Sequence, residues 1–133
     1  MTVVVDASVI LAFLLPDEDS GLGQRLFMDP ELALIAPVLA RVEVVNGLVT
    51  AFRRGRLTES VADKVLSIFR RLEIEYVDEF PPDEKLFLFA VEKKVAAYDA
   101  VYLSLALEAR APLATVDRVL AEAAASEGLL WSG

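Results

Sequence analysis

Short apolar runs alternate with longer amphipathic segments along the whole chain. The first run, Thr2–Val5, is continuous and β-branched, which is typical of a strand buried in a parallel sheet. The longer segments repeat apolar residues every three or four positions, which is the period of a helix. We predict strands at residues 2–5, 32–36, 74–77, 112–115 and 129–131. We predict helices at residues 8–15, 22–28, 38–54, 58–72, 81–94, 98–110 and 117–126.

The helix predicted over residues 38–54 has the clearest period. Gly55 follows it, at the place where helices commonly end, and Thr58 is suited to cap the next helix. Because strands and helices alternate, we expect a single α/β domain over residues 1–133, built around a mostly parallel sheet. The apolar stripe of the helix consists of large residues at steps of three and four: Val38, Val42, Val45, Val49 and Phe52.

The composition limits the chemistry that is open to this chain. It contains neither cysteine nor histidine, which excludes thiol nucleophiles, disulfides, imidazole bases and the metal sites that these side chains build. Carboxylates remain, and their oxygens favour hard cations such as Mg²⁺ or Mn²⁺. The net charge of −8 argues against a simple basic nucleic-acid binder. It does not exclude a nuclease, because a bound cation brings its own positive charge.

The sequence gives no sign of a membrane protein. No apolar run is long enough to span a bilayer, and the stretch from Val3 to Leu15 is interrupted by Asp6 and Ser8. The chain also lacks the basic start and the small-residue cleavage site of a secretory signal. We therefore expect a cytoplasmic protein that does not associate with membranes.

Two acidic residues follow predicted strands. Asp6 comes directly after Thr2–Val5, Asp117 comes after the strand at 112–115, and each also opens a predicted helix. Taken alone, either acid is explained at least as well as a helix N-cap. Parallel strands, however, bring their carboxyl ends to one edge of the sheet, where open α/β folds bind their ligands. Two Asp residues at two strand ends therefore indicate a site.

Two more acids lie inside helices. Asp99 occupies the first turn of the helix at 98–110, which suits the helix dipole. Tyr102 lies on the same face, so we expect that face to point inward. Glu43 lies in mid-helix among apolar residues; a salt bridge to Arg41 is the alternative explanation, but a separation of two positions directs these side chains apart. A buried lone carboxylate is costly, so each implies a partner or a cation.

The four carboxylates together predict a divalent cation. Like charges in one cleft repel each other and raise each other's pKa unless a cation neutralises them. Mg²⁺ takes a few direct carboxylates and keeps several waters, and such an ion activates a water nucleophile and polarises a phosphoryl oxygen. Without His or Cys, phosphodiester hydrolysis is the reaction that best suits Asp6, Glu43, Asp99 and Asp117.

The residues around these acids resemble the PIN-domain family, and within it the VapC-like toxins of bacterial and archaeal toxin–antitoxin pairs. The resemblance covers essentially the whole chain and implies a three-layer α/β/α PIN-like sandwich with a mostly parallel central sheet. It also implies an endoribonuclease that depends on Mg²⁺ or Mn²⁺. It is carried by Val4-Val5-Asp6-Ala7-Ser8, Val42-Glu43-Val44-Val45-Asn46, Tyr98-Asp99-Ala100 and Thr115-Val116-Asp117.

The resemblance assigns a role to each acid. Asp6 and Asp99 would bind the metal directly, and Asp117 would complete the site or help to hold a second ion. Glu43 would contact the metal or a water bound to it. Family members usually form homodimers, act on RNA and are silenced by a small VapB-like antitoxin that covers the acidic cleft.

Two pairs of polar residues are further candidates. Ser8 and Thr115 resemble hydroxyls that orient Asp6 by hydrogen bonds, although ordinary cap and strand residues would give the same sequence. Arg53 and Arg54 are candidates for RNA phosphate contacts, although cations at a helix C-terminus are favoured by the helix dipole alone.

Other classes of protein agree less well with the sequence. A phosphoaccepting receiver domain would need paired acids after the first strand and a Lys after a late strand, and Asp6 has no acidic neighbour. A haloacid-dehalogenase-type phosphatase would need a second Asp where Ser8 stands. A catalytically silent PIN-like interaction module would be expected to lose some of the four acids, and all four are present.

Overall fold

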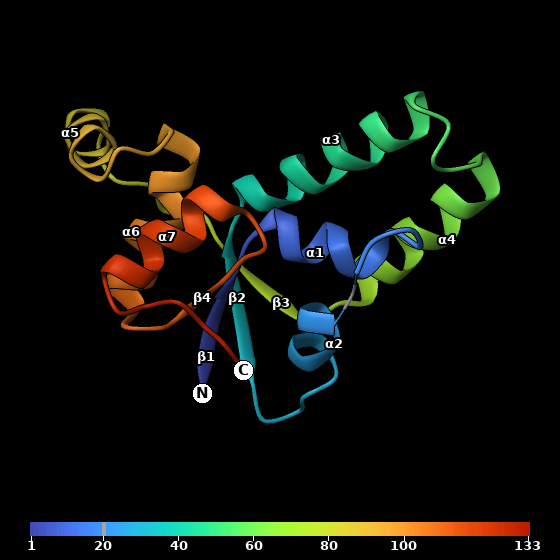
Figure 1. The fold of residues 1–133 in the computed structure, drawn as a ribbon, viewed down its shortest axis with the longest axis horizontal. Helices are drawn as coiled ribbons and strands as arrows, with labels where there is room; N and C mark the ends of the chain where they lie inside the picture. The colour runs from blue at the N-terminus through green and yellow to red at the C-terminus, as the bar shows by residue number, and fades with distance from the viewer. Residues whose placement is uncertain (20) are drawn as a thin grey trace.

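A four-stranded parallel sheet forms the centre of the molecule, which we describe from a computed structural model for residues 1–19 and 21–133 (Figure 1). The sheet has the strand order β3-β2-β1-β4, and every pairing is parallel. β1 is therefore central, with Val4 in register with Ile35 on one side and with Leu113 on the other. The strands are β1 (Thr2–Val5), β2 (Ala33–Pro37), β3 (Ile74–Val77) and β4 (Leu113–Ala114).

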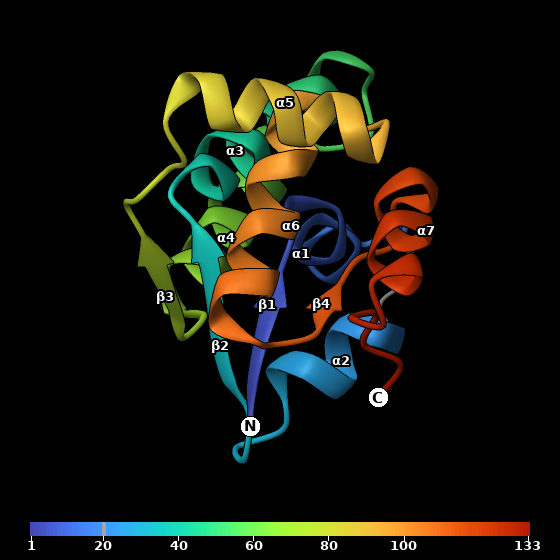
Figure 2. The same ribbon diagram turned by 90° about the vertical axis from the view of Figure 1, so that its left-hand side faces the viewer.

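Helices cover both faces of this sheet. They are α1 (Ala7–Leu14), α2 (Gly21–Phe27), α3 (Leu39–Arg53), α4 (Glu59–Arg71), α5 (Asp83–Lys93), α6 (Ala97–Ala109) and α7 (Arg118–Ser126). Helices α1 to α4 lie on one side of the strands and α5 to α7 on the other (Figure 1). α6 runs along the sheet, and α5 crosses the upper end of α6 (Figure 2). This arrangement confirms the predicted three-layer α/β/α sandwich around a parallel sheet.

The central strand and the helices beside it supply the core. Val3, Val4 and Val5 are fully buried, as expected for a strand that has helices on both faces. Ile10 of α1 and Leu103 of α6 are fully buried against them. Burying an aliphatic side chain of this size stabilises a fold by about 1.5–3 kcal/mol. The strand end that carries Asp6 is therefore anchored in the hydrophobic core.

The helix boundaries differ from the predicted ones by one or two residues. Thr58 caps α4 as predicted, since its Oγ1 accepts a hydrogen bond from the Val61 N–H at 3.3 Å. Gly55 has the left-handed φ of +73° that a residue just after a helix often adopts. The longest helix, α3, has 15 residues. Within residues 1–19 and 21–133, no helix is both long and apolar enough to cross a membrane.

α3 has two apolar faces, and the face predicted to pack is the one that is exposed. The predicted stripe of this helix is 37 to 67 % exposed at four positions: Val42, Val45, Val49 and Phe52. The buried face consists mostly of smaller residues: Ala40, Val44, Leu48 and Ala51. This smaller face packs against α1, where a Cβ placed on Gly47 would stand 2.4 Å from the Leu11 Cδ1. Small side chains permit this close approach, so the larger residues remain outside. We call the exposed set the α3 outer stripe.

The strand predicted at residues 129–131 is reduced to a single bridge. Leu130 pairs in parallel with Leu113. The Leu113 N–H donates to the Leu129 carbonyl at 2.7 Å, and the Trp131 N–H donates to the Leu113 carbonyl at 2.9 Å. β4 has only two residues, and Pro112 before it has no N–H to donate. The neighbouring segment therefore has too short an edge for a longer pairing.

Candidate active site

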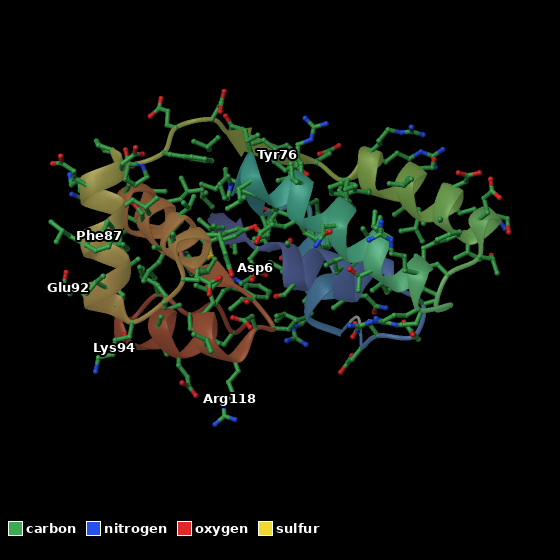
Figure 3. The ribbon with its side chains drawn as sticks, turned by 90° about the horizontal axis from the view of Figure 1, so that it is seen from above. Asp6, Tyr76, Phe87, Glu92, Lys94 and Arg118 are labelled. Carbon is green, nitrogen blue, oxygen red and sulfur yellow. The ribbon has the colours of Figure 1, made fainter. Side chains whose placement is uncertain are left out.

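The four acids singled out in the sequence surround the carboxyl ends of β1 and β4. Asp6 follows β1 and begins α1, whereas Asp117 comes three residues after the end of β4 and begins α7. Asp99 lies in the first turn of α6, and Glu43 lies in the second turn of α3. Seen from above, Asp6 lies near the middle of the molecule, between the two helical layers (Figure 3).

Asp6 is buried and accepts three hydrogen bonds. Its Oδ1 accepts from the Ser8 hydroxyl at 2.7 Å and from the Val9 N–H at 3.1 Å, and its Oδ2 accepts from the Thr115 hydroxyl at 2.6 Å. The Val9 bond makes Asp6 the N-cap of α1, so the cap explanation is correct. Burial raises the pKa of Asp6 to about 6, although the hydrogen bonds lower it, and the charge of Asp117 raises it further.

Ser8 and Thr115 join the two strand ends into one polar network. Their hydroxyl oxygens lie 3.1 Å apart. Ser8 Oγ accepts from the Val116 N–H at 3.1 Å, and Thr115 Oγ1 accepts from the Asp117 N–H at 3.0 Å. Asp117 in turn caps α7 by accepting from the Leu120 N–H at 3.0 Å. The two hydroxyls therefore hold the segment that carries Asp117 against the start of α1.

Asp99 presents a carboxylate without a hydrogen-bond donor among the described residues. Burial raises the pKa of Asp99 to about 6, and the charges of Asp117 and then Glu43 raise it further. These two contributions show that the three carboxylates lie within electrostatic reach of one another. A residue that served only the dipole of α6 would not need to lie among other acids.

Glu43 is bound by a tyrosine instead of a basic residue. The Tyr102 hydroxyl donates to Glu43 Oε1 at 2.6 Å. Arg41, the alternative partner, lies over the ring of Tyr76 at 5.6 Å from the ring centroid. The sequence placed Tyr102 on the face of Asp99 but did not reveal its contact with Glu43. The two residues are 59 positions apart, and no local pattern indicates such a pairing.

No basic side chain among residues 1–19 and 21–133 neutralises this cluster. The ion pairs among the described residues involve other acids: Arg56 with Asp17 and Glu18, Lys93 with Glu127, and Arg118 with Glu122. Likewise, no basic group is among those that shift the pKa values of Asp6 and Asp99. Four carboxylates around one edge of the sheet therefore leave a local excess of negative charge.

The carboxylate oxygens that can still accept a contact suit a hard cation. Each carboxylate oxygen can accept two hydrogen bonds, so Asp6 Oδ2, Glu43 Oε2, Asp117 Oδ1 and both oxygens of Asp99 retain capacity. An all-oxygen donor set of this kind favours Mg²⁺ or Mn²⁺. In the described part of the chain, no three acids stand close enough to enclose an ion in this conformation. An ion held here would therefore keep several water ligands, as Mg²⁺ commonly does.

The sequence matches known proteins over nearly its whole length. The family described as PIN domain matches residues 3–126. Ribonuclease VapC3 of Pyrobaculum aerophilum is 36% identical over 126 residues, which cover 92% of this chain and 94% of that protein. Ribonuclease VapC9 of Mycobacterium tuberculosis is 32% identical over 122 residues, which cover 90% of this chain and 89% of that protein. The chain belongs to the PIN-domain family.

Two solved structures share the fold of this PIN domain. PAE2754 from Pyrobaculum aerophilum superposes with a TM-score of 0.65 at 26% identity, covering 92% of this chain and 79% of that one. VapC20 of Mycobacterium tuberculosis, described as a toxin that cleaves the sarcin–ricin loop, superposes with a TM-score of 0.68 over 96% of both chains. Because its identity is 15%, that likeness concerns the fold alone. Together these comparisons confirm the resemblance to VapC-like members of the family.

The candidate RNA-binding residues of this PIN domain lie apart from its acids. Arg53 and Arg54 are exposed at the end of α3. Glu43 precedes Arg53 by ten positions, which is about 15 Å along a helix. Arg56 is engaged by Asp17 at 2.9 Å. A phosphate contact by Arg53 or Arg54 would therefore be made to a nucleotide away from the acids.

Proposed function

We propose that this protein is a metal-dependent endoribonuclease that hydrolyses RNA phosphodiesters, and that it is the cytoplasmic toxin of a VapBC-type toxin–antitoxin pair. One observation carries the proposal. Asp6, Glu43, Asp99 and Asp117 gather at the strand ends, and no basic side chain among the described residues neutralises them. The ribonuclease names of relatives at 32–36% identity support the same activity.

The four acids would hold Mg²⁺ or Mn²⁺. Asp6 and Asp99 would be direct ligands, and Asp117 would complete the site or help to hold a second ion. When bound, the cation would polarise the scissile phosphodiester and make water a stronger nucleophile. Ser8 and Thr115 would keep Asp6 in one orientation, which lowers the cost of assembling the site.

Glu43 would act on the attacking water. Its Oε1 is bound by Tyr102, and its Oε2 is free to accept a proton from the attacking water. Such proton transfer requires the carboxylate to be within hydrogen-bond reach of that water, which makes its orientation important. We therefore expect Glu43→Gln to lower the rate of cleavage more than the affinity for RNA.

The partners would be RNA, a small VapB-like antitoxin and a second copy of the chain. The α3 outer stripe starts beside Glu43 and offers an exposed apolar surface to a partner. α5 carries another such surface, since Phe87, Leu88 and Val91 are 62 to 66 % exposed (Phe87 is labelled in Figure 3). Exposed apolar patches of this kind mark interaction sites. They support a toxin that works as a homodimer and is silenced by an antitoxin.

The decisive experiment is cleavage of a structured RNA by the purified protein. The reaction is run with Mg²⁺, with Mn²⁺ and with excess chelator. Asp6→Asn keeps the shape and the N-cap of Asp6 but removes its charge. Asp63→Asn is the matched control, because Asp63 is an exposed acid of α4 that belongs to none of the ion pairs described above.

The proposal predicts discrete cleavage that needs the metal, is abolished in Asp6→Asn and persists in Asp63→Asn. Cleavage that survives in Asp6→Asn would reveal a contaminating ribonuclease. A folded protein that binds the metal and cleaves none of a broad panel of RNAs would instead favour a catalytically silent interaction module.

A further inference from the structure

Tyr102 joins the helix that carries Asp99 to the helix that carries Glu43. It belongs to α6, one turn after Asp99, and it is only 2 % exposed. Its hydroxyl donates to Glu43 Oε1 on α3 at 2.6 Å. The hydroxyl also lies close to the start of α1, the helix that Asp6 caps.

The hydrogen bond from this hydroxyl is the only one that Glu43 accepts within the described residues. Glu43 has three rotatable side-chain bonds, and no basic residue in the described ranges holds it. Without the hydroxyl, the carboxylate is free to turn to another rotamer.

We propose that Tyr102 is a positioning residue of this site, whose hydroxyl fixes the Glu43 carboxylate by donating a hydrogen bond from α6 to its Oε1 on α3. This inference rests on the proposed function, since positioning matters only if Glu43 serves the metal or its water. Tyr102 itself is buried behind the carboxylates, so it acts through Glu43.

The hydroxyl is suited to this task because it stays protonated. Burial raises the pKa of Tyr102, and the hydrogen bond and charge of Glu43, together with the charge of Asp6, raise it further. A tyrosine hydroxyl is in any case protonated at neutral pH, so it is a donor there. A phenylalanine would fill the same space, but it would leave Glu43 Oε1 without this partner.

Tyr102→Phe tests the proposal, with Tyr98→Phe as the matched control. Tyr98 lies on the same helix and is 56 % exposed, and its substitution removes the same hydroxyl group. Mn²⁺ affinity is measured by calorimetry, and cleavage is measured in single turnover. We expect Mn²⁺ binding to weaken about 10-fold in Tyr102→Phe, the usual effect of losing a residue that orients a ligand. The cleavage rate should fall while RNA affinity is unchanged, and Tyr98→Phe should match the wild type.

A double-mutant cycle separates positioning from general packing. If Tyr102 acts through Glu43, Tyr102→Phe should not weaken Mn²⁺ binding further once Glu43→Ala is present. An equal loss in both backgrounds would overturn the proposal, because the effect would then not pass through Glu43. Unchanged Mn²⁺ affinity in Tyr102→Phe alone would also overturn it. Failure of the wild type to bind Mn²⁺ would overturn the proposed function as well.

A measurement on the wild type needs no variant to fold. A buried hydroxyl proton that is held in a hydrogen bond exchanges slowly with water and is visible by NMR. We expect a slowly exchanging Tyr102 hydroxyl signal. A hydroxyl that exchanges rapidly would overturn the positioning role, whatever the effect of the substitution.

Discussion

Asp6 and Asp117 each cap a helix and also contribute charge to the acidic cluster. This double use explains why sequence could locate them but could not separate the two roles. An Asp after an apolar strand is visible in sequence, and both roles require the same position. Tyr102 was missed as a partner of Glu43 because that contact joins α3 and α6, and only the folded chain brings them together.

Asp99→Asn should stabilise the metal-free protein at neutral pH. The folded state raises the pKa of Asp99 from 3.8 to about 6, so the folded protein binds this proton more tightly than the unfolded chain does. The stabilising effect of that proton is fully present below pH 4 and is lost as the pH rises through 6. Removing the charge should add about 1–2 kcal/mol to the free energy of unfolding at pH 7.5.

Urea unfolding at pH 7.5 and at pH 4.5 measures this effect. The gain of Asp99→Asn over the wild type should be smaller at pH 4.5, where the wild-type carboxyl is largely protonated in the fold. An equal gain at both pH values would show that charge repulsion is not its cause.

Thr115→Val should destabilise the protein by about 1.5–3 kcal/mol at pH 7.5, the usual range for a hydrogen bond to a charged group. The substitution keeps the shape of Thr115 but removes the donor that lies 2.6 Å from Asp6 Oδ2. Thr115→Ser keeps the hydroxyl and is the control. Chemical denaturation of both variants gives the comparison, and a Thr115→Val variant as stable as the wild type would contradict a stabilising bond to Asp6.

At the level of elements, the period of α3 predicted a helix but not which apolar face packs. Large residues fall on one side of this helix and smaller ones on another, and the usual rule would bury the larger set. The structure buries the smaller set, because α1 approaches α3 closely at Gly47. Such a choice depends on the partner helix, which the period of a single segment does not contain. The strand predicted at 129–131 is reduced to a single bridge for a similar reason, since its neighbour β4 is too short.

Gly47→Val should destabilise the protein by about 2 kcal/mol, within the range for an overpacked interface. Any Cβ at this position stands 2.4 Å from the Leu11 Cδ1, so α1 and α3 must move apart or Leu11 must change its rotamer. Asn46→Val adds a similar side chain at the exposed neighbouring position and should change stability by less than about 0.5 kcal/mol. Thermal melts of both proteins distinguish them, and equal melting temperatures would contradict the close α1–α3 contact.

For the whole molecule, charge and apolar surface have opposite effects on association. A net charge of −8 keeps copies of the chain apart. The exposed apolar residues of α3 and α5 favour their association. The charge repulsion between copies is spread over the surface and weakens with salt. The apolar patches, by contrast, are local. We therefore expect dimerisation to depend on those patches and to strengthen as salt is added.

Phe87→Glu should convert the proposed homodimer to a monomer of 14.5 kDa. The substitution places a charge in the middle of the exposed face of α5, next to Leu88 and Val91. Val119→Glu, at a position on α7 that is also more than half exposed, is the control. Light scattering after size exclusion measures both masses. A Phe87→Glu variant that remains dimeric would move the interface away from α5.

The bond between Thr115 and Asp6 joins residues 109 positions apart. A ribosome synthesises a chain from its N-terminus at about 5–20 residues per second. β1 and Asp6 are therefore made seconds before β4 and Asp117. The acidic cluster therefore cannot assemble on a nascent chain before Asp117 has been made. A nascent chain that carries only β1 and α1 would thus be inert, because it lacks the carboxylates of α6 and α7.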